Sequence, residues 1–393
     1  MAMRKVLTWM MCCLVLMVGW GIVVLASASS IRAVQDKGNP QHYVQWQLIW
    51  IAVAVVIALI TAHFDYQKWK QNYWLVPLCL GILLLLVLVI TPGLRRNVNG
   101  SYRWLRIGPI NVQPSECAKM MVVVLFAVYL DKLGIRVKQF WLGFVFPCMA
   151  LGVVAALLFL EPDFGSLIVV GLTGGIMMFI AGTRIRFLLP GAMLAIIGTF
   201  AALWFDPNRG PRIRAWLSGL GGNADPEVAA AAEAGKSYQQ IQSLVAIKNG
   251  GPFGVGFNES IQKWNYLPEA HTDFIFAIGG EEFGFVFSLF VIVTFLIVMF
   301  CGFSIALRTQ DRQARLLAFG MTFLLAFQAI FNLGVVTKLL PPKGIALPFF
   351  SYGGTNLFVA AFAIGSLINI ARQIDSDERI VRSRAIKNAV TTL

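Results

Sequence analysis

The sequence predicts an all-α integral membrane protein with ten transmembrane helices and one long extracellular loop. Three observations support this fold class. Hydrophobic residues make up 58% of the 393 positions and charged residues only 13%, whereas soluble domains average about 25% charged residues. The mean hydropathy is +0.73. Apolar stretches of about 20 residues, enough to cross the hydrocarbon as a helix, recur along the whole chain. We therefore treat residues 1–393 as a single polytopic domain.

Ten segments have the length and composition of a membrane span. They cover approximately residues 6–26, 44–63, 74–91, 114–131, 141–160, 165–182, 187–205, 271–303, 315–338 and 350–371. The first begins after Arg4 and Lys5 and ends at Ala26-Ser27-Ala28, a pattern shared with cleaved signal peptides. A chain that crosses the membrane repeatedly needs only a signal anchor, so we predict that this segment is retained.

The distribution of basic residues predicts the orientation. Lys and Arg in the short loops at alternate ends of the spans place both termini in the cytoplasm by the positive-inside rule. The extracellular loop then runs from about residue 206 to about residue 270, and a cytoplasmic tail runs from about residue 372 to residue 393. Further basic residues fall on the predicted outer face and indicate an anionic ligand, with attraction to acidic lipid head groups as the alternative. They are Arg95, Arg96, Arg103, Arg106, Arg209, Arg212, Arg214, Lys236, Lys248, Lys263 and Lys343.

Asp273 is the strongest single candidate for chemistry. It stands in the run LPEAHTDFIF at 267–276, where the polar loop becomes an apolar span. An ionisable group at such a place is a functional-site hypothesis by default. Pro268 suits the first turn of a helix, so we predict a helix from Pro268 with Asp273 five residues in, facing the bundle. A structural aspartate paired with a basic residue is the alternative. Glu281 and Glu282, deeper on this helix, are expected to serve packing or ion pairing.

Three other groups of residues lie at span ends. Glu116 and Lys119 are three apart in the span that Pro114 opens, so they meet on one helix face as an ion pair or as substrate contacts. The segment 341–354 is irregular, which at membrane depth requires burial in protein or a water-filled cavity, and its Lys343 is a candidate phosphate ligand. The acidic turn EPDFG at 161–165 either pairs with arginines or holds a metal ion.

The extracellular loop contains segments of different predicted structure. Residues 225–235 read as a short exposed helix or a mobile spacer, and residues 238–248 have helical periodicity. The run GGPFGVG at 250–256 requires unusual backbone angles, as a plain turn or as a phosphate nest. The sequence contains no P-loop, Rossmann fingerprint or zinc-binding histidine pair. We therefore expect neither an ATP motor nor a nucleic-acid partner.

Several blocks together resemble the SEDS family of bacterial cell-wall proteins, named for shape, elongation, division and sporulation. They are RW at 103–104, QPSE at 113–116, EPDFG at 161–165, LPEAHTDFIFA at 267–277, EEFG at 281–284 and PPKGIALPFFSYGG at 341–354. The resemblance covers nearly the whole chain, and it is closer to the division branch than to the elongation branch. Two blocks depart from the family pattern. GGTN at 353–356 stands where GGSS is more usual, and GSYRW at 100–104 stands where an alanine or arginine often precedes the RW pair.

The resemblance implies ten membrane helices and polymerisation of lipid II at the outer face of the bacterial cytoplasmic (inner) membrane, at the division septum. It implies a class B penicillin-binding protein and other divisome membrane proteins as partners, and Mg²⁺ or Mn²⁺ is a candidate cofactor. The essential aspartate of the family corresponds to Asp273. The predicted substrate-binding residues are Arg103, Glu116, Lys119, Gln242, Lys263, His271, Lys343 and Ser351.

These residues suggest a glycosyl transfer in which a polyprenyl diphosphate is the leaving group. Asp273 would act as the general base toward the acceptor hydroxyl, while Arg103, Lys119 and Lys343 would stabilise the departing diphosphate. Two other function classes stay open on the sequence. A lipid II flippase would use the same cations without a base, and a non-catalytic scaffold for a penicillin-binding protein would need Asp273 only for packing.

Overall fold

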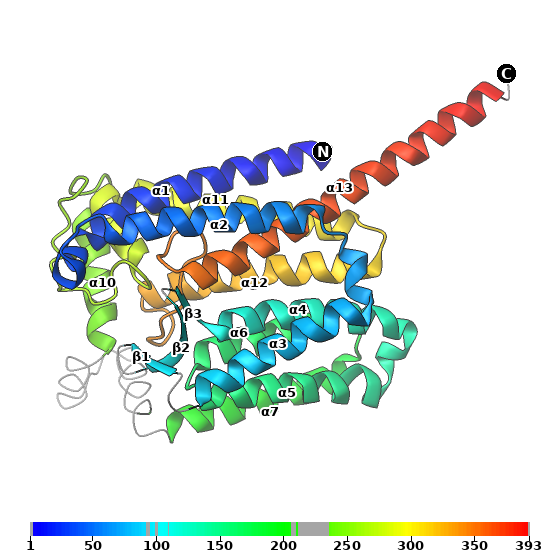
Figure 1. The fold of residues 1–393 in the computed structure, drawn as a ribbon, viewed down its shortest axis with the longest axis horizontal. Helices are drawn as coiled ribbons and strands as arrows, with labels where there is room; N and C mark the ends of the chain where they lie inside the picture. The colour runs from blue at the N-terminus through cyan, green and yellow to red at the C-terminus, as the bar shows by residue number, and fades with distance from the viewer. Residues whose placement is uncertain are drawn as a thin grey trace.

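A computed structural model describes residues 3–91, 95–98, 101–108, 110–205, 210 and 236–391. Long helices lie side by side in one bundle (Figure 1). Among the described residues, nine helices are long and apolar enough to cross a membrane. They are α1 (Met3–Lys37), α2 (His42–His63), α3 (Asn72–Ile90), the π-helical turn η3 (Trp141–Val145) with α5 (Phe146–Leu160), α6 (Phe164–Ala181), α7 (Ile185–Trp204), α11 (Ile275–Arg308), α12 (Arg312–Val336) and α13 (Gly354–Thr391).

The predicted span at 114–131 is the helix α4 (Pro114–Leu133), which begins at Pro114 as expected. Its charged residues Glu116, Lys119 and Asp131 exceed the two charges that the apolar stretch of each of the nine helices above carries at most. It packs against α3, α6 and α12, and most of its side chains are buried. The helix that carries the ion pair therefore lies inside the bundle, where protein surrounds the charges.

Two helices extend well beyond their predicted ends. α1 continues to Lys37, so the Ala26-Ser27-Ala28 motif lies inside a helix, with Ser27 and Ala28 buried. An ion pair between Arg32 and Asp36, 2.9 Å apart and one turn from each other, supports the polar extension. α13 continues to Thr391, through the predicted cytoplasmic tail. Apolar content marks where a chain enters lipid but does not mark where a helix stops.

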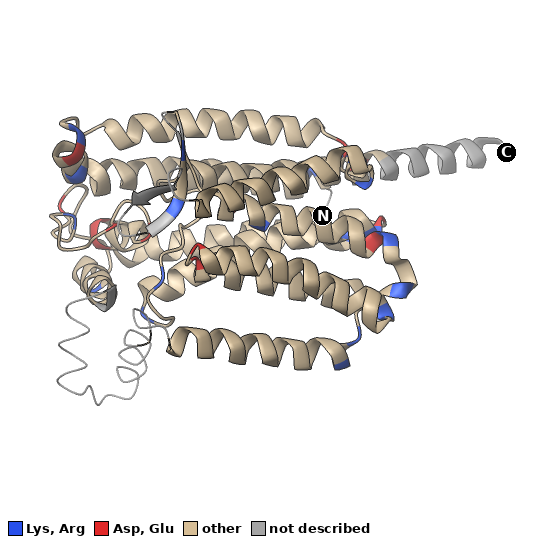
Figure 2. Cartoon of the chain, turned by 60° about the horizontal axis from the view of Figure 1, so that its bottom comes forward, with Lys and Arg blue, Asp and Glu red and all other residues tan. Residues whose placement is uncertain are grey.

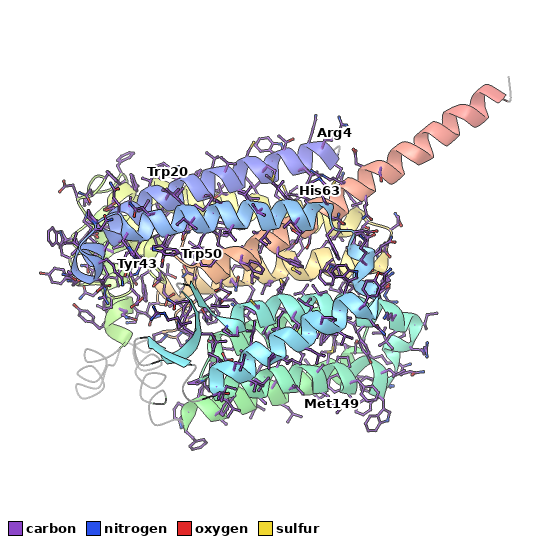
Figure 3. The ribbon with its side chains drawn as sticks, in the orientation of Figure 1. Arg4, Trp20, Tyr43, Trp50, His63 and Met149 are labelled. Atoms are coloured by element: carbon purple, nitrogen blue, oxygen red, sulfur yellow. The ribbon has the colours of Figure 1, made fainter. Side chains whose placement is uncertain are left out.

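Charged residues gather mainly toward the two ends of the bundle (Figure 2). At one end, Arg4 Nε of α1 lies 3.7 Å from Asp375 Oδ2 of α13. The helix α10 (Lys236–Gly250) and a small β-sheet lie at the opposite end (Figure 1). The labelled side chains Tyr43 and His63 mark the two ends of α2, with Tyr43 toward the α10 end (Figure 3). The helical periodicity at 238–248 is thus confirmed.

Some predicted features lie outside the described residues. They are residues 206–209 and 211–235, with Arg209, Arg212, Arg214 and the predicted spacer, and the side chains of Arg95, Arg96 and Lys236.

The sheet is a feature that the sequence did not predict. It is antiparallel in the order β1 (Arg95–Val98), β2 (Ser101–Ile107) and β3 (Ile110–Val112). Leu105 of β2 lies opposite Val112 of β3, and Gly108, with φ of +62°, stands in the tight turn between these strands. The sheet leads directly into α4, so it holds Arg103 of β2 close to the start of that helix.

The glycine-rich segment after α10 docks on a break in α11. Gly284 has φ of +73° and ψ of −163°, which interrupts the helix. Backbone groups released by a break inside a membrane span need protein partners. The N–H groups of Val255 and Gly256 donate to the carbonyls of Glu281 and Glu282 at 3.0 Å each. The segment therefore contains a turn at 251–253, which was one of the two alternatives, and the amides of Val255 and Gly256 that follow it are occupied by α11.

Candidate active site

Asp273 lies in a turn that precedes α11. The prediction of a helix from Pro268 is wrong, because α11 begins at Ile275. Glu269 has φ of +58°, and its carbonyl accepts hydrogen bonds from the N–H groups of Thr272 (3.2 Å) and Phe274 (3.3 Å). These bonds close a turn over 269–274 in place of the first helical turn. Asp273 is consequently half-buried and oriented by the turn, not by a helix face.

Three successive carbonyls of this turn are held by distant residues. Tyr352 N donates to the carbonyl of His271 at 3.1 Å. Ser351 Oγ donates to the carbonyl of Thr272 at 2.5 Å, and Asn332 Nδ2 donates to the carbonyl of Asp273 at 2.8 Å. The end of α12 and the irregular segment 341–353 therefore fix the backbone that carries the candidate base.

The carboxylate of Asp273 lies directly against the backbone of Gly344. A Cβ added at Gly344 would collide with Asp273 Oδ2. Any other residue at this position would displace either the carboxylate or the segment. The neighbour of this glycine in the chain is Lys343, so the backbone that carries the candidate phosphate ligand passes beside the candidate base.

Asp163 joins the two cations of the site. It is the N-cap of α6, and its Oδ1 lies 3.3 Å from Lys343 Nζ and 3.6 Å from Arg103 Nη1. Its Oδ2 accepts hydrogen bonds from Ser115 Oγ at 2.9 Å and from Ser166 Oγ at 2.8 Å. The side chain of Asp163 is 4% exposed, whereas those of Lys343 and Arg103 are each 19% exposed. The expectation that the acidic turn pairs with arginine is confirmed.

The two carboxyl groups of this turn have opposite electrostatic character. Burial acts to raise the pKa of Asp163, but the cations of Lys343 and Arg103 outweigh it and hold that pKa below its ordinary value. Burial, with a smaller contribution from Asp163, raises the pKa of Glu161 to about 8. Neither carboxyl oxygen of Glu161 has a hydrogen-bond partner among the described residues. At neutral pH, Asp163 is ionised and Glu161 is protonated, so Arg103, Lys343 and Asp163 together carry one net positive charge.

Glu116 and Lys119 form the ion pair that was one of the two alternatives. Lys119 Nζ lies 2.6 Å from Glu116 Oε1, and Gln328 Nε2 of α12 donates to Glu116 Oε2 at 3.4 Å. Both charged side chains are buried. The positive charge of Lys119 also helps to lower the pKa of Asp163. Direct substrate contact by this pair stays a prediction.

Lys263 has partners on α1 and α11. Its Nζ donates to Asn258 Oδ1 at 2.5 Å and to Ser27 Oγ at 3.1 Å, and lies 3.7 Å from Glu282 Oε1. Glu281 accepts a hydrogen bond from Ser260 Oγ at 2.5 Å. The packing and ion-pairing role predicted for the two glutamates is confirmed. Lys263 is enclosed in this network, and substrate binding by it stays a prediction.

The three other predicted ligands occupy different settings. The ring of His271 lies 4.7 Å from that of Tyr43 and 6.1 Å from that of Tyr352, centroid to centroid. Burial lowers the pKa of His271, so its ring is neutral at neutral pH. Ser351 is buried and accepts a hydrogen bond from Leu347 N at 2.8 Å, which makes it part of the scaffold around Asp273. Gln242 is half-buried on α10.

Sequence reasoning did not select Asn332, Gly344 or Asp163 as individual site residues. Asn332 is one of two amides in the apolar span 315–338, with Gln328, and that was the available signal for it. The function of Gly344 depends on a contact across the fold, which no local pattern displays. Within the described parts of the chain, no group of three or more His, Cys, Asp or Glu side chains is placed to hold a metal ion.

The geometry defines a class of site: a carboxylate at the end of a membrane span, held against a segment whose lysine belongs to a cationic pair. Such a site can accept a proton and stabilise an anion at the same time. The chain belongs to the FtsW/RodA/SpoVE family, because residues 7–376 match the family model described as a cell cycle protein.

Two curated relatives show how far the similarity extends. The chain is 39% identical over 357 residues to a probable peptidoglycan glycosyltransferase FtsW of Trichlorobacter lovleyi, covering 91% of each chain. It is 38% identical over 354 residues to the protein of that name from Legionella pneumophila, covering 89% of this chain and 86% of the relative.

Solved structures have the same fold. One, described as the structural coordination of polymerization and crosslinking by a peptidoglycan synthase complex, matches with a TM-score of 0.73 and 26% identity, covering 93% of this chain and 97% of that chain. The Thermus thermophilus rod shape determining protein RodA matches with a TM-score of 0.65 and 25% identity, covering 92% and 95% of the two chains.

Proposed function

We propose that this protein is a peptidoglycan glycosyltransferase that polymerises lipid II at the outer face of the cytoplasmic membrane, for septal synthesis in cell division. The names of the curated relatives support both the activity and the division role. One structural observation carries the assignment to a site. The carboxylate of Asp273 lies against Gly344, next in the chain to Lys343, whose ammonium lies 3.3 Å from Asp163.

The chemistry follows from these positions. The hydroxyl oxygen of the acceptor sugar attacks the anomeric carbon of the donor, and Asp273 takes the hydroxyl proton. The bond from that carbon to the diphosphate oxygen breaks with inversion, so the diphosphate leaves with the electron pair. Lys343 and Arg103 donate charge-assisted hydrogen bonds to the departing oxygens. A single displacement of this kind needs one base.

Asp163 prepares the two cations for this step. Before substrate binds, its buried carboxylate compensates Lys343 and Arg103 and holds them in place. Because both cationic side chains are partly exposed, an incoming diphosphate can share them without dismantling the cluster. Pre-organised charge of this kind lowers the cost of reorganisation during the reaction.

The partners and the location belong to the same proposal. We infer a class B penicillin-binding protein and other divisome membrane proteins as partners, and similarity to a peptidoglycan synthase complex that couples polymerization and crosslinking supports this. Both termini are assigned to the cytoplasm, which the basic loops favour. Mg²⁺ or Mn²⁺ stays a candidate cofactor. The steps above are assigned to residues of this chain alone.

Reconstitution with labelled lipid II tests the function. The full chain with its penicillin-binding partner in vesicles is expected to produce glycan polymer, and Asp273→Asn is expected to abolish it while the protein stays folded. Asp65→Asn, a change of the same kind at the N-cap of η1 (Tyr66–Lys70), is the matched control and should retain activity. Normal polymerisation by Asp273→Asn would show that the base assignment is wrong. Transfer of lipid II across the vesicle without polymer would favour the flippase, and neither activity would favour the scaffold.

A further inference from the structure

Asn332 connects the two segments that meet at the candidate active site. Its side chain is 2% exposed near the end of α12. The Nδ2 group donates to the carbonyl of Asp273 at 2.8 Å and to the carbonyl of Ile345 at 2.6 Å. Both hydrogens of one amide are therefore used, one on each segment.

We propose that Asn332 is a positioning residue that sets the spacing between the carboxylate of Asp273 and the ammonium of Lys343. Ile345 is two residues from Lys343, and Gly344 between them contacts the Asp273 carboxylate. The amide therefore joins the backbone that carries the proposed base to the backbone that carries the proposed phosphate ligand. The catalytic consequence of this inference rests on the proposed function. The joining of the two segments by Asn332 is independent of that function.

Stability of the helix end does not account for this asparagine. α10 already holds the region, because Gln240 Nε2 donates to the carbonyls of Val335 and Leu340 at 2.8 Å each. Moreover, Asn332 Oδ1 is buried without a hydrogen-bond partner among the residues that the structure describes. An unpaired buried acceptor is unfavourable. A leucine, with the same number of side-chain heavy atoms, would avoid that penalty, so the two donated bonds are the reason for an amide here.

The spacing matters because the two groups act in the same step. Proton removal by Asp273 and charge stabilisation by Lys343 must coincide while the bond to the diphosphate breaks. A displacement of about 1 Å in such a geometry can lower the rate by about 100-fold. Loss of Asn332 should therefore affect the chemical step more than the binding of lipid II.

Two substitutions keep the number of side-chain heavy atoms: Asn332→Leu removes both donors, and Asn332→Asp leaves at most one. We expect kcat for lipid II polymerisation to fall about 10- to 100-fold, while KM changes less than about 3-fold. Asn369→Leu is the control. Asn369 is a buried amide on α13 that also links two backbone groups, donating to Ala62 O at 3.1 Å and accepting from Tyr66 N at 3.4 Å, and its loss should leave kcat unchanged.

Hydrogen–deuterium exchange provides a readout that does not depend on activity. Asn332→Leu should accelerate exchange in both 269–274 and 343–347, whereas Asn369→Leu should accelerate it in neither. Unchanged exchange in these segments, or a rise in KM at constant kcat, would overturn the proposal. If Asn332→Leu does not fold, Asn332→Asp is measured by the same two methods. Wild-type polymerisation by Asp273→Asn would refute the proposed function, yet the exchange result would still decide whether Asn332 joins the two segments.

Discussion

The Nζ of Lys343 lies 3.3 Å from Oδ1 of Asp163, so the cation assigned to the leaving diphosphate already has a buried carboxylate partner. Arg103 approaches the same oxygen from the β-sheet at 3.6 Å. The proposed anion site is therefore assembled from three distant parts of the chain around one acidic N-cap.

Removing the charge of Asp163 should destabilise the protein. Asp163→Asn keeps a good N-cap for α6, since asparagine caps as well as aspartate. It leaves Lys343 and Arg103 without their anion, and breaking a buried ion pair costs about 3–5 kcal/mol. Because both cations are partly exposed, we expect the free energy of unfolding to fall by only about 2 kcal/mol. Thermal unfolding in detergent measures this loss. Asp311→Asn at the N-cap of α12 is the control, and an equal loss in the two variants would show that capping alone explains the effect.

A methyl group at Gly344 should disable the site without unfolding the bundle. The new Cβ of Gly344→Ala would displace the Asp273 carboxylate, so the polymerisation rate should fall about 100-fold. Gly353→Ala, in the same irregular segment, is the control, since the nearest atom to its Cβ lies at 3.8 Å. A rate for Gly344→Ala within about 3-fold of the wild type would contradict the close contact between Gly344 and Asp273.

Glu161 should make stability depend on pH. Its pKa in the folded protein is raised to about 8, from an ordinary value of 4.5. The unfolded chain therefore loses this proton first, and stability decreases as pH rises from about 4.5 to about 8. Glu161→Gln removes this dependence and should stabilise the protein at pH 8, by up to a few kcal/mol, but not at pH 4. Melting temperatures across this range test the prediction. The exposed Glu259→Gln serves as the control, and a pH-independent difference would refute the assignment.

Variants of Lys263 and Glu282 can distinguish whether Lys263 stabilises the fold or binds substrate. Lys263→Met leaves the buried carboxylate of Glu282 uncompensated, so unfolding should become easier by about 3–5 kcal/mol. Lys263→Met combined with Glu282→Gln should recover most of that stability, as read by thermal unfolding. If Lys263 serves only the ion pair, the double variant also recovers polymerisation. A stable but inactive double variant would instead support substrate binding by Lys263.

Several features of the site could be predicted from local sequence. A lone carboxylate at the mouth of an apolar span identified Asp273, and the density of prolines and glycines identified 341–353 as irregular backbone. Pro114 correctly marked the start of α4, because proline is favoured in the first helical turn. The same rule failed at Pro268, where no helix forms. Proline is compatible with the first turn of a helix, but it does not supply the hydrogen bonds that determine whether the backbone becomes helical there.

The hydrophobicity and charge of individual residues are enough to predict a helical membrane bundle with acidic and basic residues collected at span ends, because these properties do not depend on the rest of the fold. Which of those residues face each other depends on how the helices pack. Asn332 and Ser351, 59 and 79 residues away from their partners, hold the carbonyls of Asp273 and Thr272. The turn that presents the base therefore depends on contacts between distant segments, and these form only when the helices have packed.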